Sequence, residues 1–278
     1  MASRWPAFLP ALTAPPVCVR ALALTACSLA ALCHVAEERA SALALAALAV
    51  EGASAAPKRL LRTFRERAEE ALLAGMAAQV NAFFTGAPLE DWLPEAPRTA
   101  PREAVHAAAA FLSHALSEAA TLLLPTTCAR LCHTALGRAS DALVAPLLRA
   151  EDGRRFNVHA LTGLAADVAL LEGMVASLDT VSGVEGAFAE PRQLCALFAG
   201  DALERLAAPE CEASAAFRAA LQRDFFALAP TRLALLLERY REPVGPGLLH
   251  RGAVAVAAPK RKTVGVVLDR VQKLMRPK

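Results

Sequence analysis

The stretch RFNVHALTGLAADVALLE, residues 155–172, decides the fold class. Apolar side chains recur in it at intervals of three and four residues, as on one face of an α-helix, and the pattern continues to residue 178. The apolar stripe consists of Phe156, Val158 or His159, Leu161, Leu164, Val168, Leu171, Met174, Val175 and Leu178. We therefore predict one long amphipathic helix over residues 155–178.

Similar patterns lie on both sides of this stretch, separated by segments that contain proline and glycine. Helices are predicted at 57–84, 99–124, 126–149, 190–206, 230–241 and 263–276, with one or two more at 20–50. Pro146 is expected to kink or end its helix. A loop of about fifteen residues, 86–101, is expected to pack on the surface through Trp92, with Leu89 and Leu93 beside it. The one candidate strand is short, at 252–257.

The composition agrees with an all-helical chain. Of the 278 residues, 55% are hydrophobic but only 5% are aromatic, and β-branched residues are scarce, which disfavours a β-sandwich or barrel. We predict an all-α fold of stacked antiparallel helical hairpins. The seven cysteines are odd in number and irregularly spaced, so buried free thiols in a reducing compartment are expected rather than a disulfide framework.

The net charge of +3 conceals an uneven distribution. From Arg251 onward there are eight basic residues and one acid, so this tail carries +7 and the rest of the chain −4. The tail is either a solvated helix or a surface for an acidic partner or anionic lipid. The residues that would make that contact are Lys260, Arg261, Lys262, Arg270 and Lys273. Nucleic acid is not expected as a partner, because the aromatic residues that stack on bases are scarce.

Motifs for catalysis or for a metal are weak. Glu103 and His106 have the Glu-x-x-His spacing of di-iron bundles, but a second copy of the motif is missing. Cys128 and Cys132 could share a helix face, but a zinc site needs four convergent ligands. The chain has no glycine-rich phosphate loop and no Gly-x-Ser-x-Gly elbow. We therefore expect a non-catalytic protein with no cofactor and no metal; a metal-dependent helical enzyme is the weakest alternative.

Several short motifs, in collinear order, resemble one known family. In the opening stretch these are Arg-Phe-Asn at 155–157, a hydrophobic–glycine pair, then Asp-Val at 167–168 and Leu-Glu at 171–172. Further matches occur at 90–94, 96–99, 192–194, 235–241 and 259–262. Together they are similar to the exocyst complex subunit of the Rab-effector type, component six in the animal nomenclature, and the plant or algal branch fits best. The resemblance runs from about Pro57 to the end of the chain.

The resemblance implies a vesicle-tethering role without catalysis. The implied partners are other exocyst subunits and a GTP-loaded small Rab-family GTPase. The implied location is cytoplasmic and peripheral, where secretory vesicles dock at the plasma membrane. The residues expected to contact a partner are Asn157, Asp167, Glu172, Arg192 and Gln193, on and after the 155–178 helix, although Asn157 is also a good helix cap.

The resemblance also suggests how the chain is divided. Residues 1–56 form a divergent helical or targeting-like segment, 57–242 a helical-bundle domain, and 243–278 a Pro/Gly linker with a basic amphipathic helix. Because family members are several times longer, the chain resembles a C-terminal portion. The alternatives are a membrane-surface module built on the basic tail and an orphan helical scaffold fragment.

Overall fold

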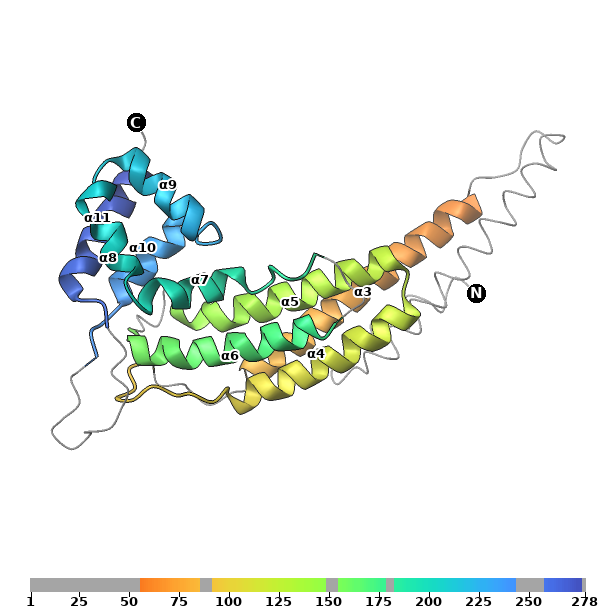
Figure 1. Cartoon of the computed structure of the whole chain (residues 1–278). Coiled ribbons are helices and arrows are strands. Elements are labelled where there is room, and N and C mark those ends of the chain that lie inside the picture. Colours follow the sequence, from red (N-terminus) through yellow and green to blue (C-terminus); the bar gives the residue numbers. More distant parts are fainter. Residues whose placement is uncertain (1–55, 86–91, 149–154, 179–182, 244–257, 277–278) are drawn as a thin grey trace. The chain divides into compact units, whose positions relative to one another are not determined.

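The computed structural model describes residues 56–85, 92–148, 155–178, 183–243 and 258–276, most of which are helical (Figure 1). The helices are α3 (Ala56–Thr85), α4 (Glu103–Leu122), α5 (Pro125–Leu148), α6 (Val158–Ala176), α7 (Ala189–Phe198), α8 (Ala202–Ala207), the short 3-10 turn η2 (Pro209–Cys211), α9 (Ser214–Asp224), α10 (Pro230–Arg239) and α11 (Arg261–Met275). The described residues contain no strand, so the predicted all-α class is confirmed. The helices predicted at 20–50 and the candidate strand at 252–257 lie outside the described residues.

The contacts divide the chain into two compact units. The first consists of Met1–Ala82, Ala110–Arg138 and Ser177–Val184, and the second of Phe83–Ala109, Ala139–Ala176 and Glu185–Lys278. Helices α3, α4 and α5 each contribute residues to both units. The expected boundary near residue 243 falls at the edge of the described residues, and α11 beyond it is part of the second unit.

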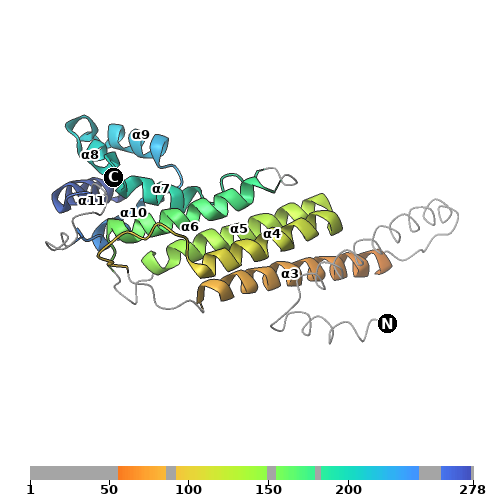
Figure 2. The same cartoon turned by 60° about the horizontal axis from the view of Figure 1, so that its bottom comes forward.

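In the first unit, α3 lies beside the second half of α4 and the first half of α5 (Figure 2). Helix α3 buries Leu72, Met76 and Val80, which are spaced four residues apart and so occupy one face. A polar contact also joins α3 to α5, because the Thr127 hydroxyl donates to Glu69 Oε1 at 3.0 Å. Arg130 Nη1 lies 3.0 Å from the other carboxylate oxygen of Glu69, so this buried carboxylate is satisfied.

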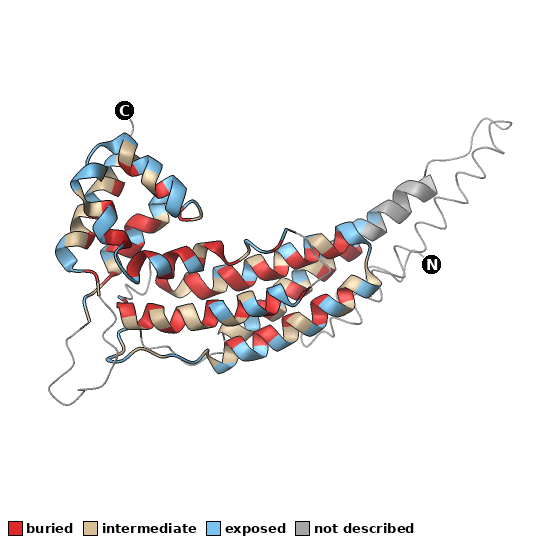
Figure 3. Cartoon of the chain, in the orientation of Figure 1, coloured by how far each residue is buried: buried red, intermediate tan, exposed pale blue. Residues whose placement is uncertain are grey.

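In the second unit, α6 is the central helix, and residues on several of its faces are buried (Figure 3). It has the length and hydropathy of a membrane span, with a mean hydropathy of 1.4, but 56% of that window is buried inside the protein, as in the core helix of a soluble protein. Helix α7 packs on α6, and α11 packs on α8, α9 and α10. Helix α11 uses its apolar face for this, because Val264, Val267 and Val271 are buried.

Two predictions for the second unit are wrong. The helix predicted over 190–206 is two helices, because Gly200 between α7 and α8 has a φ of +110°, which ends α7. No helix is predicted between residues 206 and 230, where the structure has α9. This helix buries only Phe217 and Leu221, so its apolar pattern is sparse. Pro146 lies inside α5 without ending it, close to the last turn.

The loop predicted at residues 86–101, which we call the proline loop, is only partly as predicted. The Trp92 side chain is buried, as expected, but that of Leu93 is 46% exposed. Leu89 lies outside the described residues.

Candidate functional site

The carboxylate of Asp167 is the most buried charged group in the described chain, with a side chain that is 0% exposed. Arg98 donates to both of its oxygens, with Nη1 at 3.1 Å from Oδ1 and Nη2 at 3.0 Å from Oδ2. Arg102 donates its Nε to Oδ2 at 2.6 Å and its backbone N–H to Oδ1 at 2.8 Å. Asp167 is therefore satisfied by two guanidinium groups and one backbone amide, as a buried carboxylate must be. We call these three residues the Asp167 anchor.

The Asp167 anchor also determines where α4 begins. Arg102 directly precedes the first residue of α4, and its carbonyl accepts the N–H groups of Val105 and His106 at 3.0 Å. The carboxylate of Asp167 thus sits at the positive end of the α4 dipole, where a negative charge is stabilised. The helix predicted to begin at residue 99 therefore begins four residues later, at Glu103.

Asn157 holds the other end of the proline loop. Its Oδ1 accepts the N–H of Ala160 at 3.0 Å, which makes it the N-cap of α6. Its Nδ2 donates to the carbonyl of Pro94 at 2.9 Å, and its backbone N–H donates to the carbonyl of Trp92 at 3.1 Å. Asn157 and the Asp167 anchor together fasten residues 92–102 along α6.

Gly163 allows the loop to approach α6 closely. Arg98 Nη2 donates to the carbonyl of Gly163 at 3.0 Å, and a Cβ at position 163 would lie 3.0 Å from the same nitrogen. Gly173, on the same helix, has nothing within 4 Å of such a Cβ. Glycine is therefore favoured at 163 by the close guanidinium of Arg98, and not by the backbone conformation.

Three aromatic rings close the end of α6. Phe156 and Phe198 meet edge to face with centroids 5.5 Å apart, and Tyr240 lies 5.0 Å from Phe198 and 6.0 Å from Phe156. Phe156 and Tyr240 also form an isolated parallel backbone bridge. Burial and the negative charge of Glu242 raise the pKa of the Tyr240 hydroxyl, so it stays protonated and donates to the carbonyl of Pro259 at 3.2 Å.

The five residues predicted to contact a partner separate into two groups. Asn157, Asp167 and Gln193 are buried, and the Oε1 of Gln193 accepts the N–H of Ala227 at 2.9 Å. Glu172 and Arg192 form an ion pair between α6 and α7 at 3.2 Å, and their side chains are 30% and 53% exposed. In this conformation, only Glu172 and Arg192 present charge to a partner.

The predicted basic surface lies mainly on the outside of α11. Lys260, Arg261, Lys262 and Lys273 are exposed. Arg270 is different, because its guanidinium donates to the carbonyl of Leu206 and, at 3.0 Å, to that of Ala208. Four of the five predicted residues are thus open to an acidic partner, and Arg270 joins α11 to α8.

The weaker motifs form no site in the described residues. Glu103 and His106 are both exposed on α4. Cys128 and Cys132 are buried free thiols; burial, and then the neighbouring Cys128, raise the pKa of Cys132 to about 12. In the described part of the chain, no group of three His, Cys, Asp or Glu side chains is placed to hold a metal ion.

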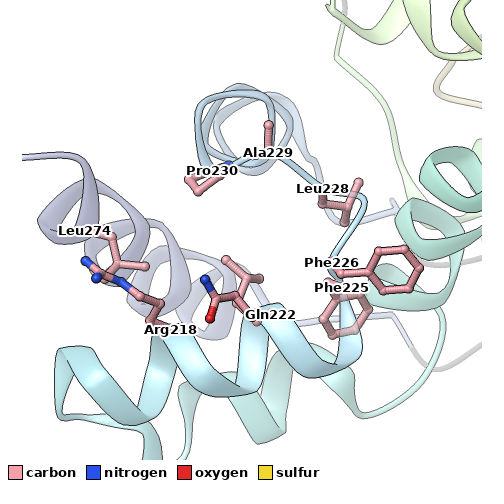
Figure 4. Close-up of a pocket in the computed structure, with 9 residues that line it drawn as sticks. Arg218, Gln222, Phe225, Phe226, Leu228, Ala229, Pro230 and Leu274 are labelled. Atoms are coloured by element: carbon pink, nitrogen blue, oxygen red, sulfur yellow. The ribbon is translucent and has the colours of Figure 1, made fainter.

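A hollow of about 300 Å³ lies between α9, the start of α10 and the end of α11 (Figure 4). Its wall is mostly apolar, and Phe226 at one end is 70% exposed. Arg218 is the charged residue of the lining and lies near Leu274. No polar constellation with catalytic geometry lines this hollow.

Comparison with known protein families gives a match over residues 24–239. This stretch matches the family model described as exocyst complex subunit Sec15, C-terminal. The chain belongs to the Sec15 family of exocyst subunits. No curated protein and no solved structure matches the chain.

The family match confirms the resemblance but changes its limits. It begins at residue 24, upstream of the expected start near Pro57, and it ends at residue 239. The basic motif at 259–262 therefore lies outside the matched stretch. As a Sec15-type exocyst subunit, the chain has a role in vesicle tethering, in a family that acts as a non-catalytic scaffold and contacts other exocyst subunits.

Sequence reasoning missed the arginines that hold this site together. Arg98 falls in the predicted loop at 86–101, and Arg102 falls near the start of the helix predicted from residue 99. No residue close to them in the sequence indicates that both bind Asp167. The available signal was Asp167 itself, an acid within a strongly apolar helix, because a buried carboxylate needs a cationic partner.

Proposed function

We propose that this exocyst subunit binds a GTP-loaded Rab-family GTPase and so docks secretory vesicles at the plasma membrane, as a cytoplasmic protein peripheral to the membrane. The observation that carries the proposal is the Sec15 family match over residues 24–239. The candidate surface is the α6–α7 face, which we define as Ala169, Glu172, Gly173, Arg192 and Ala196, all exposed or half-buried.

The chemistry of the α6–α7 face suits a protein partner. The other exposed residues of this face, Ala169, Gly173 and Ala196, are small, so another backbone can approach closely and its charges can reach both members of the Glu172–Arg192 ion pair. Helices α6 and α7 pack on each other and offer a rigid platform. Dependence on GTP would come from the partner, because the switch loops of such GTPases are ordered only with the γ-phosphate bound.

Asn157, Asp167 and Gln193 enter the proposal as positioning residues. They are buried and fix the loop, α6 and the turn after α9. Substituting them would weaken partner binding only through loss of the fold, whereas Glu172 and Arg192 would act directly.

A pull-down with the full chain tests the proposal, using Rab-family GTPases loaded with a GTP analogue or with GDP. We expect recovery with the GTP analogue to exceed that with GDP, and E172R and R192E each to abolish the difference. Because E172R/R192E recreates the ion pair in reverse, it separates loss of folding from loss of the surface. Arg205→Glu on α8, an exposed arginine, is the matched control. Equal recovery in both nucleotide states overturns the Rab proposal.

A second candidate function is contact with an anionic membrane through α11. Its apolar face is occupied inside the unit by Val264, Val267 and Val271, so this contact would be electrostatic and would not insert the helix. Co-sedimentation of the full chain with vesicles, with and without acidic lipid, tests it. Sedimentation that is independent of acidic lipid would remove this function.

A further inference from the structure

Three distant segments of the second unit meet beside the start of α11. The backbone N–H of Phe156 donates to the carbonyl of Arg239 at 3.3 Å, and the N–H of Arg241 donates to the carbonyl of Phe156 at 2.8 Å. The Tyr240 hydroxyl ties this bridge to Pro259. A side-chain oxygen of Glu242 accepts the backbone N–H of Arg261. Residues 155–156, 239–242 and 259–261 therefore form one small assembly.

This assembly gathers three arginines, Arg155, Arg241 and Arg261, which we call the arginine cluster. Side chains alternate in extended backbone. With the rings of Phe156 and Tyr240 packed inward, Arg155 and Arg241 point to the outside, where Arg155 is exposed and Arg241 half-buried. The guanidinium of Arg241 is held by the carbonyls of Glu238 at 3.0 Å and Tyr240 at 2.7 Å.

The cluster is close enough for its charges to repel. Burial, and then the positive charges of Arg155 and Arg261, lower the pKa of Arg241. The side chain of Glu242 does not neutralise them through a guanidinium contact here, because its hydrogen bond is to a backbone amide. The arrangement therefore holds three arginines around one acid, Glu242, and its charge stays positive.

The start of α11 adds positive potential to the same place. Its N-cap is Lys260, its first two residues are Arg261 and Lys262, and no acid lies in its first turn. A helix N-terminus carries a partial positive charge and favours anions, so basic residues there are unfavourable. The Glu242 carboxylate on the N–H of Arg261 supplies one negative charge against Lys260, Arg261 and Lys262. Clustered arginines and this helix end thus point to the same kind of ligand.

We propose that the arginine cluster, with Lys260 and Lys262, binds the phosphorylated headgroup of an anionic membrane lipid. Phosphate is favoured because each guanidinium can donate two parallel hydrogen bonds to its oxygens. This inference rests on the membrane contact proposed above and assigns the headgroup site within it. Arg155 and Arg241 lie outside the basic tail and extend the site to two further segments.

The rest of α11 identifies the source of the phosphate as a membrane surface. At 100° per residue, Lys262, Lys273 and Arg276 lie on one side of the helix, opposite the buried valines, and the exposed Asp269 lies among them. All three basic side chains are exposed and outnumber this one acid, so the side keeps a net positive charge along the helix away from the cluster. A membrane offers many negative charges over such a length, whereas an isolated phosphate would reach only the cluster.

The experiment measures binding of the full chain to three kinds of vesicle with equal total negative charge. One carries a phosphoinositide bisphosphate, one phosphatidylserine and one phosphatidic acid; soluble inositol phosphate and inorganic phosphate are the unanchored probes. The test variant is R155Q/R241Q/R261Q. The control is R205Q/R218Q/R223Q, which removes the same charge from exposed arginines of α8 and α9.

We expect the phosphoinositide vesicles to bind best and R155Q/R241Q/R261Q to lose about tenfold or more in affinity for them, with less than about twofold loss in the control. Equal losses in the two triple variants would overturn the headgroup site but leave an electrostatic membrane contact. Binding of soluble inositol phosphate that needs the cluster, without vesicle binding, would overturn the membrane source. No binding to any probe overturns both the headgroup site and the membrane contact. Circular dichroism and thermal unfolding verify that each variant is folded.

Discussion

The Asp167 anchor and the arginine cluster are built from the same residue type in the same unit, with opposite results. In the anchor, two guanidinium groups surround a carboxylate that is 0% exposed, and the charges are used to join the loop to α6. In the arginine cluster, Glu242 bonds to a backbone amide, and burial together with like charges lowers the pKa of Arg241. A carboxylate bonded directly to the guanidinium groups thus separates the arginines of the anchor from those of the arginine cluster.

Removing the carboxylate of the anchor should have the largest effect. In D167N, Arg98 and Arg102 lose their counter-charge while partly buried, which typically costs about 3 kcal/mol or more. Urea unfolding followed by circular dichroism measures the free energy of unfolding. D269N, which removes an exposed acid from α11, is the control and should change it by less than about 0.5 kcal/mol. Similar values for the two variants would show that the anchor contributes nothing to stability.

Loss of Asn157 should have the next largest effect. Asn157→Ala removes the cap of α6 and the bond to Pro94 together, and we expect the free energy of unfolding to fall by about 2 kcal/mol. Asn157→Asp keeps a capping oxygen but loses the Nδ2 donor, so it should lie between the wild type and alanine. An aspartate variant as unstable as the alanine variant would contradict the capping role.

Two glycines of α6 should respond in opposite directions. Gly163→Ala places a Cβ 3.0 Å from the guanidinium of Arg98, and the shift of this anchored side chain should cost about 1 kcal/mol net. Gly173→Ala meets nothing within 4 Å and should stabilise the protein by about 0.5–1 kcal/mol through helix propensity. Thermal unfolding of both variants, compared with the wild type, measures the two changes in stability. A stabilising Gly163→Ala would mean that the Arg98 side chain moves away freely.

Local sequence patterns predicted the helices well and their partners poorly. The long helices follow from apolar spacing, which is a property of the sequence within each element, as α6 and α11 illustrate. The break at Gly200 depends on a left-handed backbone conformation, and α9 has only two buried residues to reveal it. Polar contacts such as Arg98–Asp167 join residues 69 positions apart, and no local pattern encodes such a pairing.

The predicted partner residues show the same limit. Asn157, Asp167 and Glu172 follow one another on one helix, yet the first two are buried and the third is half-buried beside Arg192. Which face of α6 is covered depends on α7 and on the proline loop. The tail residues were easier to predict, because an amphipathic helix with three buried valines exposes its charged side wherever it packs.

The smallest expected effect has the opposite sign to that of D167N. Arg261→Gln removes a positive charge from the N-terminal end of α11 and from its neighbours Arg155 and Arg241, while the backbone bond to Glu242 remains. We expect the free energy of unfolding to rise by about 0.3–0.5 kcal/mol at low salt. The gain should shrink in about 1 M salt, where charges are screened over about 3 Å, whereas the loss in D167N should persist because its charges are buried. Urea unfolding at both salt concentrations measures this, and a destabilised Arg261→Gln would mean that Arg261 supports the fold and is not held ready for an anion.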